Sequence, residues 1–294
     1  MTNYLLYAST VFVWGSTWIA ITFQLGDVPV QLSIAYRFFL AAILLYVFCQ
    51  LTGRRYRFRL RDHPAIALQG LFLFCTNYYL LYLCTQFLTS GLVSVLFSTL
   101  VFWNILGSAV LFKTPVQMKV IFGAILGLCG IVAIFWTELS AFDLSEGTSI
   151  GLLLGLAGTL SASAGNLTSM KMQNRGWPVM ETITLAMCYG AGFMVLLNFI
   201  LGAPFVLDFT LPYIGSLLYL AVFGSVIGFG CYLTLIGKIG AGRAGYSSVL
   251  FPVVALTLST VFEDFHWTAL SLAGVALVLL GNVFILLNPE AKTN

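Results

Sequence analysis

Long apolar stretches fill almost the whole chain and leave few folds open to it. Of its 294 residues, 60% are hydrophobic and only 8% are charged, whereas a soluble domain carries about a quarter charged residues. Because roughly 20 apolar residues cross a bilayer as a helix, the chain has room for about ten spans. This composition excludes an ordinary soluble domain, a disordered chain and a disulfide-built scaffold. The net charge of +3 is too small to suggest a nucleic-acid partner.

Breaks at proline, glycine and charged residues divide the apolar sequence into ten predicted spans. The first run follows no basic segment, so we expect a retained span rather than a signal peptide. Connections are short, and no extramembrane domain with its own core is expected. The predicted spans are Tyr4–Phe23, Gln31–Cys49, Pro64–Gln86, Gly91–Phe112, Met118–Trp136, Ile150–Gln173, Thr182–Leu201, Pro212–Gly237, Ala244–Phe262 and Thr268–Leu287.

The basic residues fall on one side of this ten-span arrangement. Twelve of the 13 Lys and Arg residues follow even-numbered spans or lie in the C-terminal tail, while the opposite connections carry acids such as Asp27, Asp208 and Glu263. Lys and Arg near span ends remain in the cytoplasm. We therefore expect a multi-pass protein of a bacterial inner membrane with both termini in the cytoplasm.

The two halves of the sequence resemble each other. The tetrapeptide Ser-Val-Leu-Phe occurs at 94–97 and again at 248–251, and the following span of each half has glycines seven apart. Five spans are an odd number, so a second copy enters the membrane from the opposite side, as in many secondary transporters. We predict an all-α membrane protein of ten transmembrane helices in two inverted five-helix repeats, residues 1–142 and 143–294. The repeated glycines are Gly123, Gly130, Gly274 and Gly281.

Short motifs in both halves resemble the EamA-type members of the drug/metabolite transporter superfamily. Trp14-Gly15-Ser16 is similar to the first-helix motif of that family, and 36–42 is similar to its arginine-containing second helix. In the second half, 240–244, 250–254 and then Glu263 carry the resemblance. It implies a ten-helix transporter that moves amino acids or other small metabolites outward. Ser98 stands where the first half would match Pro252, which argues against the same backbone bend in both halves.

Arg37 is the one ionisable residue well inside a predicted span, roughly 10 Å from its outer end at 1.5 Å per residue. Polar groups at such depth are costly and face the protein interior or a wet cavity. Arg37 is either a charge anchor for substrate or a structural residue. In the structural role it reaches outward or pairs with Asp27, Glu263 or Asp264. Because the family carries this arginine with diverse substrates, we favour the structural role.

Aromatic and amide side chains on six spans are the predicted lining of a substrate cavity, since ligand pockets combine apolar walls with a few polar contacts. For any single aromatic residue, packing in the core or against lipid is the alternative. Small residues such as Gly224 and Gly228 are assigned to close helix packing. The predicted substrate-binding residues are Trp14, Asn77, Tyr78, Tyr82, Trp103, Asn104, Ser163, Asn166, Tyr232, Tyr246 and Ser248.

Together these features predict a secondary transporter that works by alternating access and exports amino acids or related amphiphilic metabolites. The alternatives are an exporter of cationic drugs or quaternary amines, because aromatic faces attract cations, a non-transporting subunit, or a membrane enzyme. An enzyme is disfavoured because His63 and His266 fall on opposite sides of the membrane and no carboxylate lies in mid-span. No metal or cofactor is expected.

The same lack of mid-span carboxylates bears on energy coupling, because proton pumps usually carry such groups inside the membrane. We expect facilitated or exchange-type transport, with proton coupling through Glu263 or Asp264 as the alternative. The expected partners are a small-molecule substrate and the lipid bilayer. We expect the chain to act as a monomer or a weak homodimer.

Overall fold

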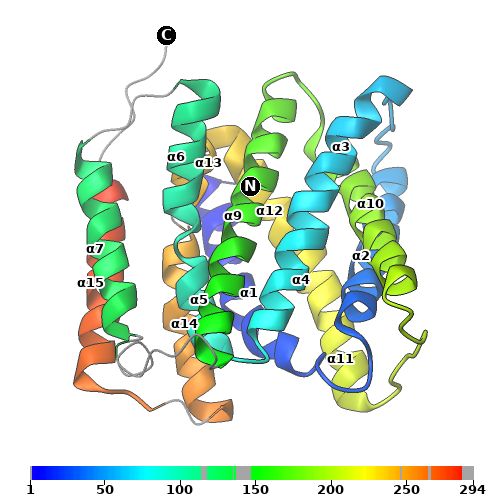
Figure 1. Ribbon diagram of the computed structural model, residues 1–294. Coiled ribbons are helices and arrows are strands. Elements are labelled where there is room, and N and C mark those ends of the chain that lie inside the picture. Colours follow the sequence, from blue (N-terminus) through cyan, green and yellow to red (C-terminus); the bar gives the residue numbers. More distant parts are fainter. Residues whose placement is uncertain are drawn as a thin grey trace.

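The chain folds into a bundle of helices that run roughly alongside one another (Figure 1). The computed structural model describes residues 2–113, 118–134, 136, 147–245, 247–263 and 266–286, and over these residues the regular structure is entirely helical. Helices satisfy their own backbone hydrogen bonds, which is what a chain needs where no water is available. The predicted all-α membrane architecture is therefore supported.

Within the described residues, eight helical stretches are long and apolar enough to cross a membrane. Shorter apolar segments lie in two further helices, and each range predicted from the sequence overlaps one of these ten stretches. The eight are Asn3–Thr22 (α1), Val30–Leu51 (α2), Leu60–Cys84, Ser90–Phe112, Gly147–Gln173 (α9), Val179–Ile200 (α10), Leu211–Ile239 and Ala241–Phe262. The two further helices are α7 (Met118–Ile134) and α15 (Ala269–Leu286).

Four of the long stretches are built from shorter helical segments. The first consists of η1 (Leu60–Asp62), α3 (His63–Gln69), η2 (Gly70–Thr76) and α4 (Asn77–Cys84). The second consists of α5 (Ser90–Phe97) and α6 (Leu100–Phe112). The third consists of α11 (Leu211–Tyr219), η3 (Leu220–Ile227) and α12 (Gly228–Ile239), and the fourth of α13 (Ala241–Gly245) and α14 (Ser247–Phe262).

Two π-helical segments occupy matching positions in the two halves of the chain. The segment η2 begins at Gly70 and η3 begins at Leu220, 150 residues later. π-helical turns are rare and often occur at functional sites. Each segment lies in the middle of a long helical stretch, which makes the surroundings of η2 and η3 the first place to search for a site.

The fourth predicted span is interrupted although it contains no proline, so spans 4 and 9 do not bend alike, as the sequence indicates. The chain leaves the helix at Ser98 and Thr99, between α5 and α6. Their hydroxyl groups donate to the carbonyl oxygens of Val95 (2.6 Å) and Leu96 (2.7 Å). Such bonds compete with the helical ladder and bend helices. Two hydroxyl side chains thus interrupt this span, whereas Pro252 lies inside the continuous helix α14.

The helix contacts occur in matched pairs. Helix α1 packs on α12 and α14, while α9 packs on α4 and α6; α2 packs on η3, while α10 packs on η2. The remaining large contacts, α2 with α10, α5 with α14 and α7 with α15, join equivalent helices to each other. Exchanging the two halves of the chain therefore leaves this set of contacts unchanged.

Helices α7 and α15 lie side by side at one edge of the bundle (Figure 1) and meet through the repeated glycines. A Cβ atom on Gly130 would lie 2.6 Å from the carbonyl oxygen of Gly274, and one on Gly274 would lie 2.6 Å from that of Gly130. One on Gly281 would meet the carbonyl oxygen of Gly123. The two backbones touch at both points, the kind of close approach that small residues permit in membranes.

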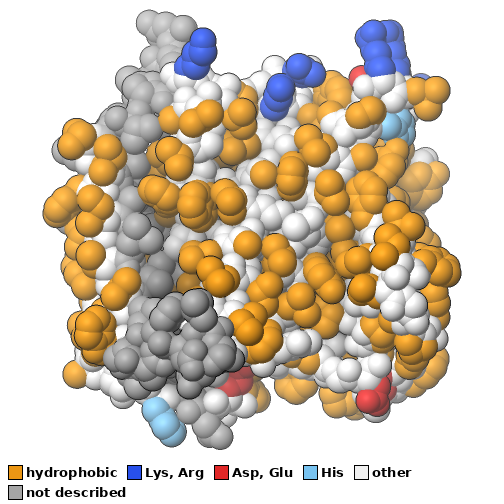
Figure 2. All heavy atoms as spheres, in the orientation of Figure 1, with side chains coloured by type: hydrophobic (Ala, Val, Ile, Leu, Met, Phe, Trp, Pro, Cys, Tyr) orange, Lys and Arg blue, Asp and Glu red, His pale blue; other side chains and the backbone are white. Residues whose placement is uncertain are grey.

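Charged side chains gather at the two ends of the bundle, with an apolar surface between them (Figure 2). Lys and Arg occupy the upper end, where one acidic side chain is also visible, and the other visible Asp and Glu lie at the lower end. Glu181 departs from this pattern, since it is 5% exposed in the first turn of α10 and pairs with Arg54, 3.7 Å between Oε2 and Nη1. The described charges thus define a basic end and an acidic end.

Replacing Gly130 with alanine should lower the melting temperature of the detergent-solubilised protein by several degrees, because the new methyl group would press on the backbone of α15 and overpacking costs about 1–3 kcal/mol. Gly127 on the same helix is the matched control, since nothing lies within 4 Å of a Cβ built there. Gly127→Ala should leave the melting temperature unchanged or slightly higher. Equal effects of the two substitutions would contradict the contact.

Candidate functional site

A cavity lies in the interior of the bundle, between α1, α2, the stretches that contain η2 and η3, the α5–α6 stretch, and α9. The cavity volume is about 30 Å³, room for one or two water molecules, so binding a larger solute requires that the surrounding helices move apart. Its aromatic lining is Trp14, Trp18, Tyr78, Phe97, Phe229 and Tyr232. Its polar lining is Thr17, Arg37, Asn77 and Asn166. Both halves of the chain contribute, with apolar walls and few polar groups, as is usual for ligand pockets.

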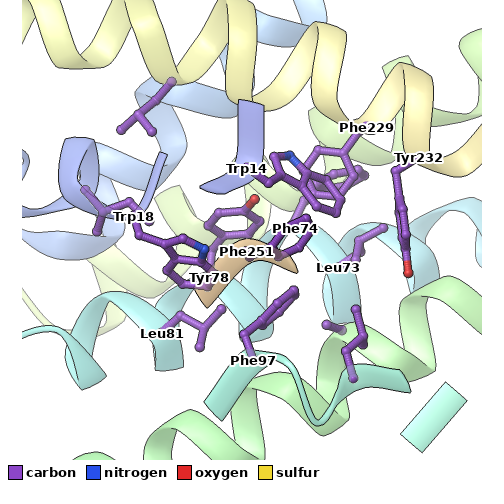
Figure 3. Packing of buried hydrophobic residues seen from close by; sticks show 14 of the residues in the cluster. Trp14, Trp18, Leu73, Phe74, Tyr78, Leu81, Phe97, Phe229, Tyr232 and Phe251 are labelled. Carbon is purple, nitrogen blue, oxygen red and sulfur yellow. The ribbon is translucent and has the colours of Figure 1, made fainter. Parts of the chain in front are cut away.

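The aromatic residues pack around one another on neighbouring helices (Figure 3). The ring centroid of Trp14 lies 4.8 Å from those of Phe229 and Tyr232, and that of Trp18 lies 5.2 Å from Phe97. Edge-to-face and tilted contacts of this kind are favoured by aromatic pairs. The wall of the cavity is therefore held in place by ring packing between helices far apart in the sequence.

The π-helical segment η3 provides a partner for Trp14. The Trp14 indole N–H donates to the carbonyl oxygen of Gly224 (2.8 Å), and a Cβ atom on Gly228 would collide with the same indole. A Cβ on Gly224 would come within 2.9 Å of both Arg37 Nη2 and Thr17 Cγ2. The two glycines predicted only to bring helices together thus also make room for side chains that line the cavity.

Arg37 lies inside the bundle with 1% of its side chain exposed. Its Nε donates to Ser225 Oγ (2.9 Å), and its terminal nitrogens lie 3.4 Å from the hydroxyl groups of Tyr78 and Tyr82. The guanidinium carbon stands 4.6 Å from the centroid of the Tyr78 ring, within range of a cation–π interaction. All of these partners are neutral.

Among the described residues, Arg37 shows neither the outward reach nor the pairing with Asp27 or Glu263 that its structural role was expected to involve. The side chain does not reach outward, because it is buried, and it forms no ion pair with Asp27 or Glu263. The carboxylate of Glu263 instead accepts hydrogen bonds from Ser90, at 3.0 Å from its backbone nitrogen and 2.6 Å from Oγ. Asp264 lies outside the described residues. Arg37 therefore carries an uncompensated charge in the described interior.

A cluster of amide and phenol groups lies beside the cavity. Asn104 and Asn166 each direct Nδ2 at the hydroxyl oxygen of Tyr232, at 3.4 and 3.3 Å. Asn104 also donates to the carbonyl oxygen of Ala241 (3.3 Å). The cluster connects α6, α9, α12 and α13, so it couples helices from both halves.

Three polar atoms of the lining residues have no hydrogen-bond partner within the described ranges: Trp18 Nε1, Asn77 Oδ1 and Asn166 Oδ1. A buried polar atom without a partner costs about 1–3 kcal/mol, and native structures rarely leave such atoms unsatisfied. The cavity thus offers one donor and two acceptors to a solute or to water.

The structure brings most of the predicted site residues together. Trp14, Asn77, Tyr78, Asn166 and Tyr232 line the cavity. Tyr82 and Asn104 stand directly behind this lining, the first at Arg37 and the second at Tyr232.

The remaining predicted residues fall elsewhere. The buried face of α6 follows Leu100, Val101, Asn104 and Ser108, which turns Trp103 away against Phe102. Ser163 is buried next to Ala162 but does not line the cavity, and Ser248 donates to the Gly245 carbonyl of its own helix. Tyr246 lies outside the described residues.

Some residues of the cavity are not among the predicted substrate-binding residues. Trp18 is one of them, although it lies four residues from Trp14 on the same helix face, a spacing that indicates the same cavity. Phe97 and Phe229 are indistinguishable in the sequence from other apolar residues of their spans. Ser225 belongs to a small-residue run assigned to packing, and only the π-helical geometry of η3 directs its hydroxyl group to Arg37.

Comparison with known proteins agrees with this geometry. The sequence model of the EamA-like transporter family matches residues 1–136 and 149–287. The chain is 28% identical to the uncharacterized transporter YvbV of Bacillus subtilis, over 98% of this chain and 92% of that one. It is 27% identical to a probable amino-acid metabolite efflux pump of Salmonella typhimurium, over 93% and 92%. A solved crystal structure superposes with a TM-score of 0.71 at 17% identity, over 96% of this chain and 95% of that one, which supports the fold alone.

Replacing Trp14 with phenylalanine should destabilise the protein by about 1 kcal/mol, because it removes the hydrogen bond to Gly224 while it keeps most of the ring packing. Trp136→Phe is the matched control, since that side chain is 55% exposed. Thermal unfolding in detergent should show a melting temperature lowered by a few degrees for Trp14→Phe and unchanged for Trp136→Phe. A Trp14 variant as stable as the control would mean that this bond does not hold η3 in place.

Proposed function

The chain belongs to the EamA-like transporter family, and from that premise we propose that it is a secondary transporter that exports amino acids or related amphiphilic metabolites across a bacterial inner membrane. The observation that carries the proposal is the buried cavity shared by both halves, with aromatic walls and a few polar groups. Transporters built from repeats bind their substrates between the repeats near the membrane midplane. The efflux-pump name of the Salmonella relative supports the same direction and solute class.

Alternating access by two inverted five-helix repeats, residues 1–142 and 143–294, is the proposed architecture. The family model matches once in each of these halves. The helix contacts occur in equivalent pairs, and the π-helical segments η2 and η3 lie at equivalent positions of the two halves. The basic end of the bundle faces the cytoplasm in this proposal, because Lys and Arg are retained there. Both termini would then be cytoplasmic.

Contacts between the halves lie on both sides of the cavity along the α5–α6 stretch. Towards the acidic end, the Glu263 carboxylate accepts hydrogen bonds from Ser90 at the start of α5. Towards the basic end, Asn104 bonds the carbonyl oxygen of Ala241 at the start of α13. Phe97 and Leu100, which line the cavity, lie between these two positions along the α5–α6 stretch. A solute that enters from one end and leaves from the other requires that each contact opens in turn.

Exchange-type or facilitated movement fits the described groups better than proton-driven pumping. Glu181 is buried at the basic rim beside Arg54, and Glu263 is engaged with Ser90 at the acidic end. Neither carboxylate lines the cavity. Coupling through Glu263 is the alternative, because its protonation would weaken its hydrogen bonds with Ser90.

An exporter of cationic drugs or quaternary amines is the second candidate function. The aromatic rings around the cavity favour it, since Trp and Tyr faces attract cations. The buried positive charge of Arg37 in the same cavity opposes it.

The purified chain in liposomes preloaded with unlabelled amino acids should transiently accumulate the same amino acid in labelled form. Each of the 20 common amino acids is assayed separately, with and without an imposed pH gradient. A carrier shows such counterflow because its binding site opens to the two sides of the membrane in turn, so that it carries labelled solute in as unlabelled solute leaves. We expect equal rates in both conditions; strict dependence on the gradient would overturn the exchange mechanism, and no counterflow of any amino acid would overturn the proposed solute class.

Enlarging Ala162 should block transport, at a cost in folding stability of about 1–3 kcal/mol because the cavity is small. Ala162 is 1% exposed and lines the cavity on α9, so Ala162→Leu fills part of the solute space. We expect counterflow to fall at least tenfold. Ala157→Leu on the outer face of the same helix is the control and should transport at the wild-type rate; similar rates in both variants would move the solute site away from this cavity.

A further inference from the structure

Arg37 is the one charged residue among those that line the cavity, and no carboxylate of the described residues forms an ion pair with its guanidinium. Three of its five N–H donors are directed at Ser225, Tyr78 and Tyr82, which leaves two free within the described residues. Burial of a charge without a counter-ion is costly. Two of the three existing bonds are long, at 3.4 Å, so the group is held loosely enough to accept another partner.

We propose that Arg37 binds the carboxylate of the transported solute, an inference that rests on the proposed transport function. A carboxylate can accept two parallel N–H bonds from the planar guanidinium and neutralises its charge at the same time. Two of the neutral partners keep their contacts with Arg37 when the carboxylate binds. The Tyr78 ring stays 4.6 Å from the guanidinium carbon, and Ser225 Oγ stays 2.9 Å from Nε. The solute supplies the counter-ion that the described part of the protein lacks.

The shape of the protein around Arg37 supports a binding role. Gly224 has no side chain, and a Cβ atom there would lie 2.9 Å from Nη2. The neighbouring Ser225 belongs to the same π-helical segment and fixes the orientation of the guanidinium through Nε. This segment therefore positions Arg37, while Arg37 itself contacts the solute.

The ammonium group of an amino acid needs hydrogen-bond acceptors, and these lie on other walls of the same cavity. Asn77 Oδ1 and Asn166 Oδ1 are acceptors without partners among the described residues. They lie on α4 and α9, whereas Arg37 lies on α2. A zwitterionic α-amino acid satisfies the cation on one wall and the acceptors on the others, and an apolar side chain would meet the aromatic rings.

This arrangement separates the two candidate functions. A quaternary amine or cationic drug without a carboxylate places a second positive charge beside the unneutralised Arg37, and like charges at close range are repelled. Specificity is often set by such a repulsive element as well as by attractive contacts. Arg37 thus selects for carboxylate-bearing solutes and rejects simple cations of the same shape.

The test compares each amino acid that shows counterflow with two analogues of the same side chain: its amide, and the amine that lacks the carboxyl carbon. Unlabelled analogue competes against the labelled amino acid in liposomes that contain the full chain. In the wild type we expect the acid to compete at least tenfold better than the amide or the amine. In Arg37→Gln this preference should disappear, and in Arg37→Lys, which keeps the charge but loses the planar fork, it should be reduced.

Arg175→Gln is the matched control, since it removes one exposed arginine at the basic end and should keep the wild-type preference. If Arg37→Gln does not fold, as judged by gel filtration and thermal unfolding, the role of Arg37 is tested by the competition of acid, amide and amine in the wild type and in Arg37→Lys. Equal competition by acid, amide and amine in the wild type would overturn the role of Arg37 while counterflow itself upholds transport. If no amino acid shows counterflow, the proposed solute class and this inference fail together.

Discussion

Arg37 keeps a guanidinium in the interior of an apolar bundle, where the described part of the chain provides no carboxylate to neutralise it. Much of the surrounding structure is arranged around this group. Gly224 leaves space for it, Ser225 fixes its Nε, and the Tyr78 ring lies beside its charged carbon. Because burial of an uncompensated charge is expensive, this arrangement is easier to explain by an anionic solute than by stability alone.

The second constraint is that the walls of the cavity come from both halves of the chain. Each half contributes a π-helical segment, and η3 holds both Trp14 and Arg37 through neighbouring residues. Glycines bring the backbones of the halves into close contact, and side-chain hydrogen bonds also cross between them, among them those of Gln24 with Ser216, Gln31 with Asn198 and Ser33 with Tyr213. A mechanism that opens alternate ends of one cavity has to exchange some of these bonds as the halves move.

The architecture was predictable because its signals are long: apolar runs, one-sided charges and repeated glycines extend over tens of residues. The position of five residues on the cavity was also predictable, since amide and aromatic groups stand out inside apolar spans: Trp14, Asn77, Tyr78, Asn166 and Tyr232. Local geometry was not predictable. A helix face turns Trp103 away from the cavity, the hydroxyl groups of Ser98 and Thr99 interrupt a span that has no proline, and the surroundings of Arg37 depend on a π-helical segment that no sequence pattern indicates.

An experimental structure of the chain bound to an amino acid that it transports would test the proposed place of the solute, in this cavity with its carboxylate on Arg37. We expect carboxylate oxygens within hydrogen-bond distance of the Arg37 guanidinium and an ammonium group near Asn77 or Asn166. An Arg37 neutralised by a protein carboxylate, or a solute bound outside the ring of Trp14, Tyr78 and Phe229, would contradict it.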